Sequence, residues 1–294
     1  MPFRPSAQRL VPDELQELWG LVETGELSAA EFQTRHEQLL QRYRAIWTEA
    51  LLLEGQSDLP TSILAEIALR FGDKDLRETR RRCEQAVAVV RDRWTAEVTP
   101  ANRESVETFY DENEAYIYDL MWWHTLVEDH SPLAYVLALQ FCQERRCRSC
   151  LDFGCGVGAG NILFARNGID VMGADISTVL LAFSRWRLEL RDLPTALVDT
   201  RVDSLPLGAF EMVMAMDTFE HLVDPVQTVV DLWACLTPGG YLFGRFFYDE
   251  LEENYPQHIV HDFGATFERM KSLGFVEVWR DEWVWGHQAF QKPS

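Results

Sequence analysis

The sequence lacks any long apolar run. No stretch of about 18 consecutive apolar residues occurs among its 294 residues, so we expect no transmembrane helix. The N-terminal segment MPFRPSAQRL also lacks the apolar core of a signal peptide. Cysteines number only six, and without a secretion signal they are expected to be reduced thiols. Together these absences predict a cytoplasmic protein that does not enter a membrane.

Basic charge is scarce in comparison with acidic charge. The chain has 27 Lys and Arg against 47 Asp and Glu, which gives a formal net charge of −20. Nucleic acids and anionic membranes both attract basic surfaces, so this composition disfavours a general role on either. The apolar content of 47% is that of a folded globular protein, and the length allows more than one domain.

Residues 10–98 are predicted to be helical throughout. Leu15, Leu18, Trp19 and Val22 follow the spacing of an amphipathic helix, and the stretch Ser28 to Glu31 has the pattern of a capping box. Two further helices are expected at about 61–71 and 75–94. We therefore expect an N-terminal all-helical domain at 1–100. Its apolar stripes must be buried, and a homodimer through these helices is one way to bury them.

The pattern changes after the segment TPANRES at 99–105. Residues 101–148 are predicted to form a helical lid or connector that includes the aromatic stretch ETFYDENEAYIYDLMWWHTL. From Ser149 onward, short apolar runs alternate with amphipathic segments, which is typical of α/β proteins with a doubly wound, mostly parallel sheet. The tail reads as a helix, a turn at Gly274 and two closing strands. Residues 149–294 are thus expected to form the ligand-binding domain.

The segment LDFGCGVGAG at 151–160 marks the expected binding turn. Gly154, Gly156 and Gly158 allow the backbone to approach a ligand where the first strand turns into a helix. Such a turn alone is compatible with a dinucleotide or with another cofactor. Asp152 at the strand end would repel a pyrophosphate but attract the ammonium and sulfonium groups of S-adenosylmethionine. Asp175, at the end of the second strand, can accept hydrogen bonds from two ribose hydroxyls.

With these residues in view, the span 150–245 resembles the class I, seven-strand methyltransferases, in the branch that acts on small molecules. The run Asp152 to Gly158 matches their first motif, and Asp175 matches the acid that closes their second strand. Three further stretches are similar to later signatures of the family: Leu205-Pro206, Glu220-His221 and the Pro-Gly-Gly turn at 238–240. The resemblance implies a Rossmann-like seven-stranded sheet.

It also implies an enzyme that uses S-adenosyl-L-methionine and releases S-adenosyl-L-homocysteine. A small-molecule acceptor would be methylated on oxygen, nitrogen or carbon by in-line attack on the sulfonium methyl. The implied task of the protein is mainly to bring acceptor and cofactor together in alignment.

The resemblance assigns cofactor contacts along the chain. The adenine-contacting acid usually stands at the position of Arg201, so Asp203 is the expected substitute. Tyr116 and Tyr118 are expected to close over the methionine end, where aromatic faces attract a sulfonium; ordinary helix–sheet packing by Trp122 and Trp123 is the alternative. The expected cofactor contacts are Asp152, Gly154, Gly156, Gly158, Asp175, Ile176, Asp203, Ser204, Asp217, Tyr116 and Tyr118.

Three histidines are the catalytic candidates. His221 follows the fourth strand and serves either as a base or as a structural hydrogen-bonding group. His258 and His261 lie where such enzymes place a substrate lid, and with Asp262 they could bind a metal, act as bases or line a pocket. We expect no metal. The spacing of CQERRCRSC is similar to that of iron–sulfur proteins, but buried thiols are the preferred interpretation.

Two other functions stay open at this point. Residues 66–87 resemble a helix-turn-helix, with Ala68, Gly72 and a basic second helix, which would suit a regulator that binds nucleic acid. Glu78 occupies a position where that motif requires an aliphatic residue, and the acidic composition argues against it. The second is a methyltransferase fold with a non-methylating role.

Overall fold

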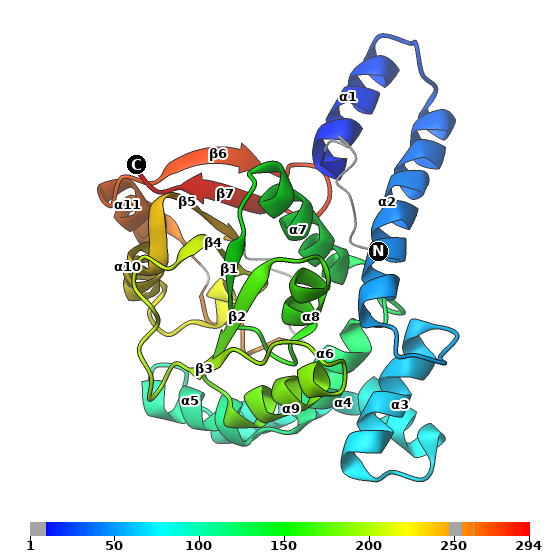
Figure 1. Ribbon diagram of the computed structural model, residues 1–294, viewed down its shortest axis with the longest axis vertical. Helices are drawn as coiled ribbons and strands as arrows, with labels where there is room; N and C mark the ends of the chain where they lie inside the picture. Colours follow the sequence, from blue (N-terminus) through cyan, green and yellow to red (C-terminus); the bar gives the residue numbers. More distant parts are fainter. Residues whose placement is uncertain (1–9, 247–254, 261) are drawn as a thin grey trace.

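The computed structural model describes residues 10–246, 255–260 and 262–294. A seven-stranded sheet runs through the C-terminal half in the order β3-β2-β1-β4-β5-β7-β6 (Figure 1). Strand β7 is antiparallel to β5 and β6, and the pairs among β1 to β5 are parallel, which confirms the predicted doubly wound sheet. The strands are Ser149–Phe153 (β1), Asp170–Asp175 (β2), Leu197–Asp199 (β3), Phe210–Ala215 (β4), Leu236–Arg245 (β5), Val276–Arg280 (β6) and His287–Gln291 (β7).

Both faces of the sheet are buried under helices. Along β4, Met212 and Met214 belong to one hydrophobic cluster, whereas Val213 and Ala215 belong to another. This alternation follows from the strand period of two, and it explains why β4 reads as a continuous apolar run. Helices α7 (Ala134–Glu144), α8 (Ala159–Arg166) and α9 (Thr178–Glu189) cover one face, and α10 (Pro225–Cys235) and α11 (Gly264–Ser272) cover the other (Figure 1).

The parallel register brings the carboxyl ends of the central strands together. Asp152 of β1 lies opposite Gly173 of β2 and Met214 of β4. The segments that follow these strands therefore meet along one edge of the sheet. In open α/β sheets this edge is where ligands bind.

The N-terminal helices begin and end at local signals in the sequence. Helix α2 (Ala29–Leu51) starts at the predicted capping box of Ser28 and Glu31, and α1 (Val11–Glu23) precedes it. Helix α3 (Leu59–Phe71) ends at Gly72, whose left-handed backbone has φ 74°. Helix α4 (Leu76–Glu97) then starts at Asp75, whose side chain accepts a hydrogen bond from the Arg77 N–H. These short-range signals explain why all four helices are predictable.

Helices α1 and α2 form a hairpin that extends beyond the sheet, yet its base is part of the main core (Figure 1). Tyr43 and Trp47 of α2 are fully buried in the same cluster as Phe141 of α7 and Met212 of β4. The Trp47 indole also donates a hydrogen bond to the carbonyl of His124 (3.0 Å). The division into 1–100, 101–148 and 149–294 stays a prediction, but the first part shares its core with the third.

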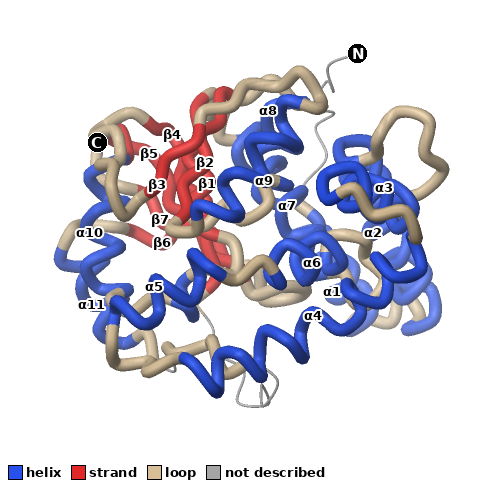
Figure 2. Tube along the Cα trace, turned by 90° about the horizontal axis from the view of Figure 1, so that it is seen from below, coloured by secondary structure: helices blue, strands red, loops and turns tan. Residues whose placement is uncertain are grey.

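Helices α5 (Arg103–Glu112) and α6 (Ala115–Trp123) connect the two halves. Seen from below, α5 and α4 lie along the lower part of the view, and α6 lies next to α4 (Figure 2). Short helical turns at Ser131–Leu133 (η1) and Phe219–His221 (η2) complete the described elements. Among the helices of the described residues, none combines the length and the apolar composition needed to cross a membrane. All six cysteines are buried free thiols.

Candidate active site

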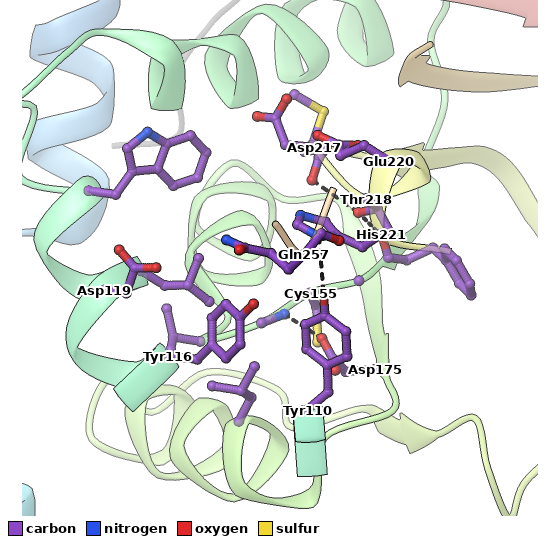
Figure 3. Close-up of a pocket in the computed structure, with 18 of the residues that line it drawn as sticks. Tyr110, Tyr116, Asp119, Cys155, Asp175, Asp217, Thr218, Glu220, His221 and Gln257 are labelled. Carbon is purple, nitrogen blue, oxygen red and sulfur yellow. Dashed lines mark hydrogen bonds between the residues drawn. The ribbon is translucent and has the colours of Figure 1, made fainter. Parts of the chain in front are cut away.

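A cavity of about 440 Å³ opens at the carboxyl edge of the sheet (Figure 3). One wall comes from the segments after β1, β2 and β4, and the opposite wall comes from α5 and α6. The segment 255–258 and Arg245 at the end of β5 complete the acceptor end. The cavity thus lies where the sheet topology predicts a ligand, and the aromatic lid helices expected from the sequence do cover it.

The glycine-rich turn forms the floor of the cavity. Gly154, Gly156 and Gly158 all have positive φ, at 78°, 50° and 75°. Gly154 and Gly156 line the cavity. Gly158 lies behind the turn, where a Cβ would come within 2.2 Å of Ser184 Oγ on α9. The first two glycines therefore expose backbone to a ligand, while Gly158 permits α9 to pack closely.

Asp175 links this turn to the end of β2. Its carboxylate accepts hydrogen bonds from the Gly156 N–H (2.8 Å) and the Ser177 N–H (2.9 Å), one on each oxygen. Burial raises the pKa of this carboxyl, and the backbone N–H groups act in the opposite direction. Each oxygen keeps a second lone pair, and the residue lines the cavity. Asp175 is therefore placed to accept hydroxyl hydrogen bonds, as the sequence predicts.

Asp152 is fully buried and does not line the cavity. The Asn161 amide donates to its Oδ2 (3.2 Å) and accepts from the Gly173 N–H (3.0 Å). Burial, with Asp175 as a second cause, raises the pKa of Asp152 to about 8. In the described part of the chain its Oδ1 has no hydrogen-bond partner. Asp152 thus lies beneath the turn, and its direct contact with the cofactor stays a prediction.

Four further expected cofactor contacts divide into two groups. Ile176 and Asp217 line the cavity, whereas Asp203 and Ser204 are exposed and lie outside it. Arg201 turns toward α5 and forms an ion pair with Asp111 (2.7 Å). Thr200 is the residue of this loop that lines the cavity, and the cofactor contacts of Asp203 and Ser204 stay predictions.

The aromatic lid contributes one of its two predicted tyrosines. Tyr116 lines the cavity with Tyr110, but Tyr118 lies on the other side of α6. There its ring stacks on Phe71 at a centroid distance of 5.6 Å, with the Arg82 guanidinium 4.0 Å from the ring centroid. The helical period explains why Tyr116 and Tyr118 lie on different faces of α6, and the contact of Tyr118 with the cofactor stays a prediction. The residues of α6 that line the cavity are Tyr116, Asp119, Leu120 and Trp123.

Two of the three candidate histidines lie in the cavity wall. The Nδ1 atom of His221 is 2.9 Å from the Tyr110 hydroxyl and 3.1 Å from the Gln257 carbonyl (Figure 3). Burial lowers the pKa of His221 to about 4, so its ring is neutral at pH 7. The ring of His258 packs against it edge-on, with 4.6 Å between centroids. His261 lies outside the described residues. Asp262 accepts a hydrogen bond from the Gly264 N–H (2.8 Å) at the start of α11.

Asp119 and Arg245 are charged residues of the cavity lining that the sequence analysis missed. Asp217 forms an ion pair with Arg245 (3.1 Å). Burial, followed by the negative charge of Glu128, raises the pKa of Asp119 to about 7. Asp119 stands three residues after Tyr116, so the helical period could have identified it; no comparable local signal existed for Arg245.

Residues 66–87 form α3, a turn and α4, but their arginines are already paired. Arg80 and Arg81 form ion pairs with Glu84 (2.8 Å) and Glu78 (2.5 Å), and Arg82 lies 3.5 Å from Asp73. Nearby acidic side chains thus neutralise the charge of the helix that would contact the nucleic acid in a helix-turn-helix protein. These contacts argue against the helix-turn-helix interpretation. The thiols of the CQERRCRSC segment likewise point at backbone carbonyls, Cys142 at Cys147 (3.6 Å) and Cys147 at Glu211 (3.8 Å).

Comparisons with known proteins match the C-terminal half of the chain. Residues 151–244 match a family described as a methyltransferase domain. A ubiquinone biosynthesis O-methyltransferase of Photorhabdus laumondii is 34% identical over 132 residues, which cover 42% of this chain and 54% of that protein. One of Acinetobacter baumannii is 27% identical over 163 residues, covering 50% and 64%. The chain thus spans between half and two thirds of the length of these two relatives.

Among solved structures, the PH0226 protein of Pyrococcus horikoshii is similar with a TM-score of 0.46 at 18% identity, covering 56% of this chain and 91% of that one. The structure contains three features of the predicted fold: the glycine-rich motif at 152–158, Asp175 at the end of β2, and the strand order. The family match therefore shows a methyltransferase domain at residues 151–244 of the chain.

Proposed function

We propose that this protein transfers a methyl group from S-adenosylmethionine to an oxygen atom of a small molecule. The proposal rests on the glycine-rich turn and Asp175 at the floor of the cavity. The Asp175 carboxylate accepts a hydrogen bond from the Gly156 N–H and also lines the cavity. The relatives' name, O-methyltransferase, supports oxygen as the acceptor atom. A small-molecule acceptor also suits a cavity of about 440 Å³.

The residues present fit such a cofactor. Asp175 would accept the ribose hydroxyls, and Ile176 beside it would offer apolar contact to the cofactor. Carboxylates dominate the charged lining, which favours a cation in a partly desolvated cavity. Tyr110 and Tyr116 present aromatic rings close to the same region, and aromatic faces attract cations. When bound, the cofactor supplies a methyl group activated by its sulfonium.

The chain's own residues would orient the acceptor and take its proton. His221, with a pKa near 4, is a weak proton acceptor at neutral pH, and its Nδ1 is held by Tyr110 and Gln257. Asp119, with a pKa near 7, matches the requirement of a general base far better. We assign proton acceptance to Asp119 and a positioning role to His221. A catalytic role for His258 and His261 stays a proposal.

The first experiment is cofactor binding to the full chain. Calorimetry with S-adenosylhomocysteine should show saturable binding, and the ligand should raise the melting temperature because it binds the folded state alone. Radiolabelled methyl transfer to a panel of phenols, catechols and amines should then label hydroxyl compounds. Binding without transfer to any hydroxyl would favour a non-methylating role, and the lack of binding at millimolar ligand would refute the proposal.

A cytoplasmic location and a homodimer through the N-terminal helices also belong to this proposal. Trp19 and Leu21 of α1 are 38% and 37% exposed, which leaves apolar surface on the helical hairpin. Light scattering on the purified chain should give the mass of two copies. A monomer mass would contradict the dimer without affecting the proposed chemistry.

A further inference from the structure

Three side chains meet at the acceptor end of the cavity with the chemistry of metal ligands. Glu220, His221 and His258 each offer one ligand atom, and these atoms lie within 4.8 Å of one another. We propose that they form a binding site for a divalent transition-metal ion. The sequence analysis expected no metal and considered His258 with His261 and Asp262 as the alternative; the structure assigns a different set.

The backbone holds this cluster in place. The Glu220 carbonyl accepts hydrogen bonds from the Ile259 N–H (2.8 Å) and the Val260 N–H (3.0 Å). The His258 N–H in turn donates to the Tyr255 carbonyl (3.0 Å). Two segments distant in the sequence are thereby joined beside the end of β4. The approach of His258 to His221 is therefore a consequence of main-chain structure and not of two mobile surface side chains.

The surroundings of His221 select the form of imidazole that binds metals. The Gln257 carbonyl 3.1 Å from Nδ1 can only accept, so Nδ1 carries the proton and Nε2 carries the lone pair. Histidines that bind metals characteristically donate their other N–H to a carbonyl or carboxylate in this way. The Tyr110 hydroxyl, 2.9 Å from the same Nδ1, further restricts the ring.

The donor set indicates the class of ion. Two imidazoles and one carboxylate suit Zn²⁺, Co²⁺, Fe²⁺ or Mn²⁺ better than Mg²⁺ or Ca²⁺, which prefer oxygen ligands. Three protein ligands leave further positions for water or substrate, and all three residues line the cavity. If the proposed function holds, an ion here would favour the ionised form of an acceptor hydroxyl, whose proton Asp119 would take.

Metal binding can be tested without any methyl acceptor. The full chain is treated with a chelator, dialysed and titrated with Co²⁺ by calorimetry and by visible absorption. We expect one Co²⁺ per chain, with His258→Ala and Glu220→Gln each weakening its affinity at least about tenfold. His36→Ala is the matched control, because His36 lies on α2 outside the cavity lining, and this variant should bind Co²⁺ as the unmodified chain does.

Folding and cofactor binding are measured on the same samples. His258 is only half-buried, so His258→Ala should keep its melting temperature and its affinity for S-adenosylhomocysteine while losing Co²⁺. The lack of saturable Co²⁺ binding, or equal binding by all three variants, would overturn the metal site. If Co²⁺ does not bind but S-adenosylhomocysteine does, the proposed function stands without the metal site. If Co²⁺ binds but S-adenosylhomocysteine does not, the metal site stands and the proposed function is overturned.

Discussion

Glu66 of α3 and Arg187 of α9 form an ion pair from which solvent is fully excluded, with 2.8 Å between Oε2 and Nε. Arg191 contacts the other carboxylate oxygen at 2.5 Å. The Arg187 Nη1 atom also donates to the carbonyl of Val157 in the glycine-rich turn (2.8 Å). A helix of the N-terminal half is thereby connected, through one guanidinium, to the floor of the cofactor cavity.

Removing this carboxylate should destabilise the whole protein. Glu66→Ala leaves two buried guanidinium groups without a counter-charge, and breaking a buried pair in this way costs about 3–5 kcal/mol. Urea denaturation should show that loss in the free energy of unfolding. Glu84→Ala is the control, because the Glu84–Arg80 pair is exposed and such pairs contribute about 1 kcal/mol or less. Equal losses in the two variants would contradict this account of the Glu66 pair.

Asp175 should dominate cofactor affinity. Hydrogen bonds to a charged group are worth about 1.5–3 kcal/mol each, so Asp175→Ala should weaken the binding of S-adenosylhomocysteine at least about tenfold. Calorimetry measures the affinity, and a melting curve confirms that the variant is folded. Asp170→Ala changes an exposed acid at the opposite end of β2 and should bind normally. Unchanged affinity in a folded Asp175→Ala variant would show that Asp175 does not contact the ribose.

Gly158 should tolerate a methyl group less well than another glycine of similar φ. In Gly158→Ala the new Cβ would come within 2.2 Å of Ser184 Oγ, whereas at Gly168, with φ 80°, nothing lies within 4 Å. Both variants carry backbone strain of about 1 kcal/mol, and overpacking adds roughly 1–3 kcal/mol at Gly158 alone.

Urea denaturation compares the two variants. Adding Ser184→Ala to Gly158→Ala removes the nearest atom and should restore part of the loss. Equal destabilisation at Gly158 and Gly168 would mean that α9 moves away from the turn at little cost.

Asp119 should make stability depend on pH. Its pKa in the folded state is about 7, while an unfolded aspartate titrates near 3.9. Between these values the folded protein keeps a proton that the unfolded chain has lost, so this group's contribution to stability falls as the pH rises through that window. Asp119→Asn removes the cost of ionising this carboxyl in the folded protein. The gain in unfolding free energy of the variant over the unmodified chain should therefore be roughly 2 kcal/mol larger at pH 8 than at pH 5.

Urea denaturation at both pH values measures that difference. Glu189→Gln, at an exposed position on α9, should show no such change. The prediction fails if Asp119→Asn shifts stability equally at pH 5 and pH 8.

Local signals in the sequence sufficed for much of the fold. The capping box at Ser28, the stop at Gly72 and the strand–glycine–helix turn at 152–158 each depend on residues a few positions apart, and the structure contains all three. Asp175 was identifiable for the same reason, since it closes a strand that follows the turn. The helix that carries Tyr116 and Tyr118 was predictable, but which of its faces lines the cavity depends on how α6 packs.

The sequence by itself determined the alternation of strands and helices, the glycine-rich turn and the acid beside it. These features follow from backbone preferences and apolar periodicity, which act over short distances along the chain. The tertiary structure alone decided that Arg201 pairs with Asp111, that Glu66 reaches Arg187, and that His258 lies against His221. Each of these contacts joins segments that are far apart in the sequence, and only the packing of helices across the sheet edge brings them together.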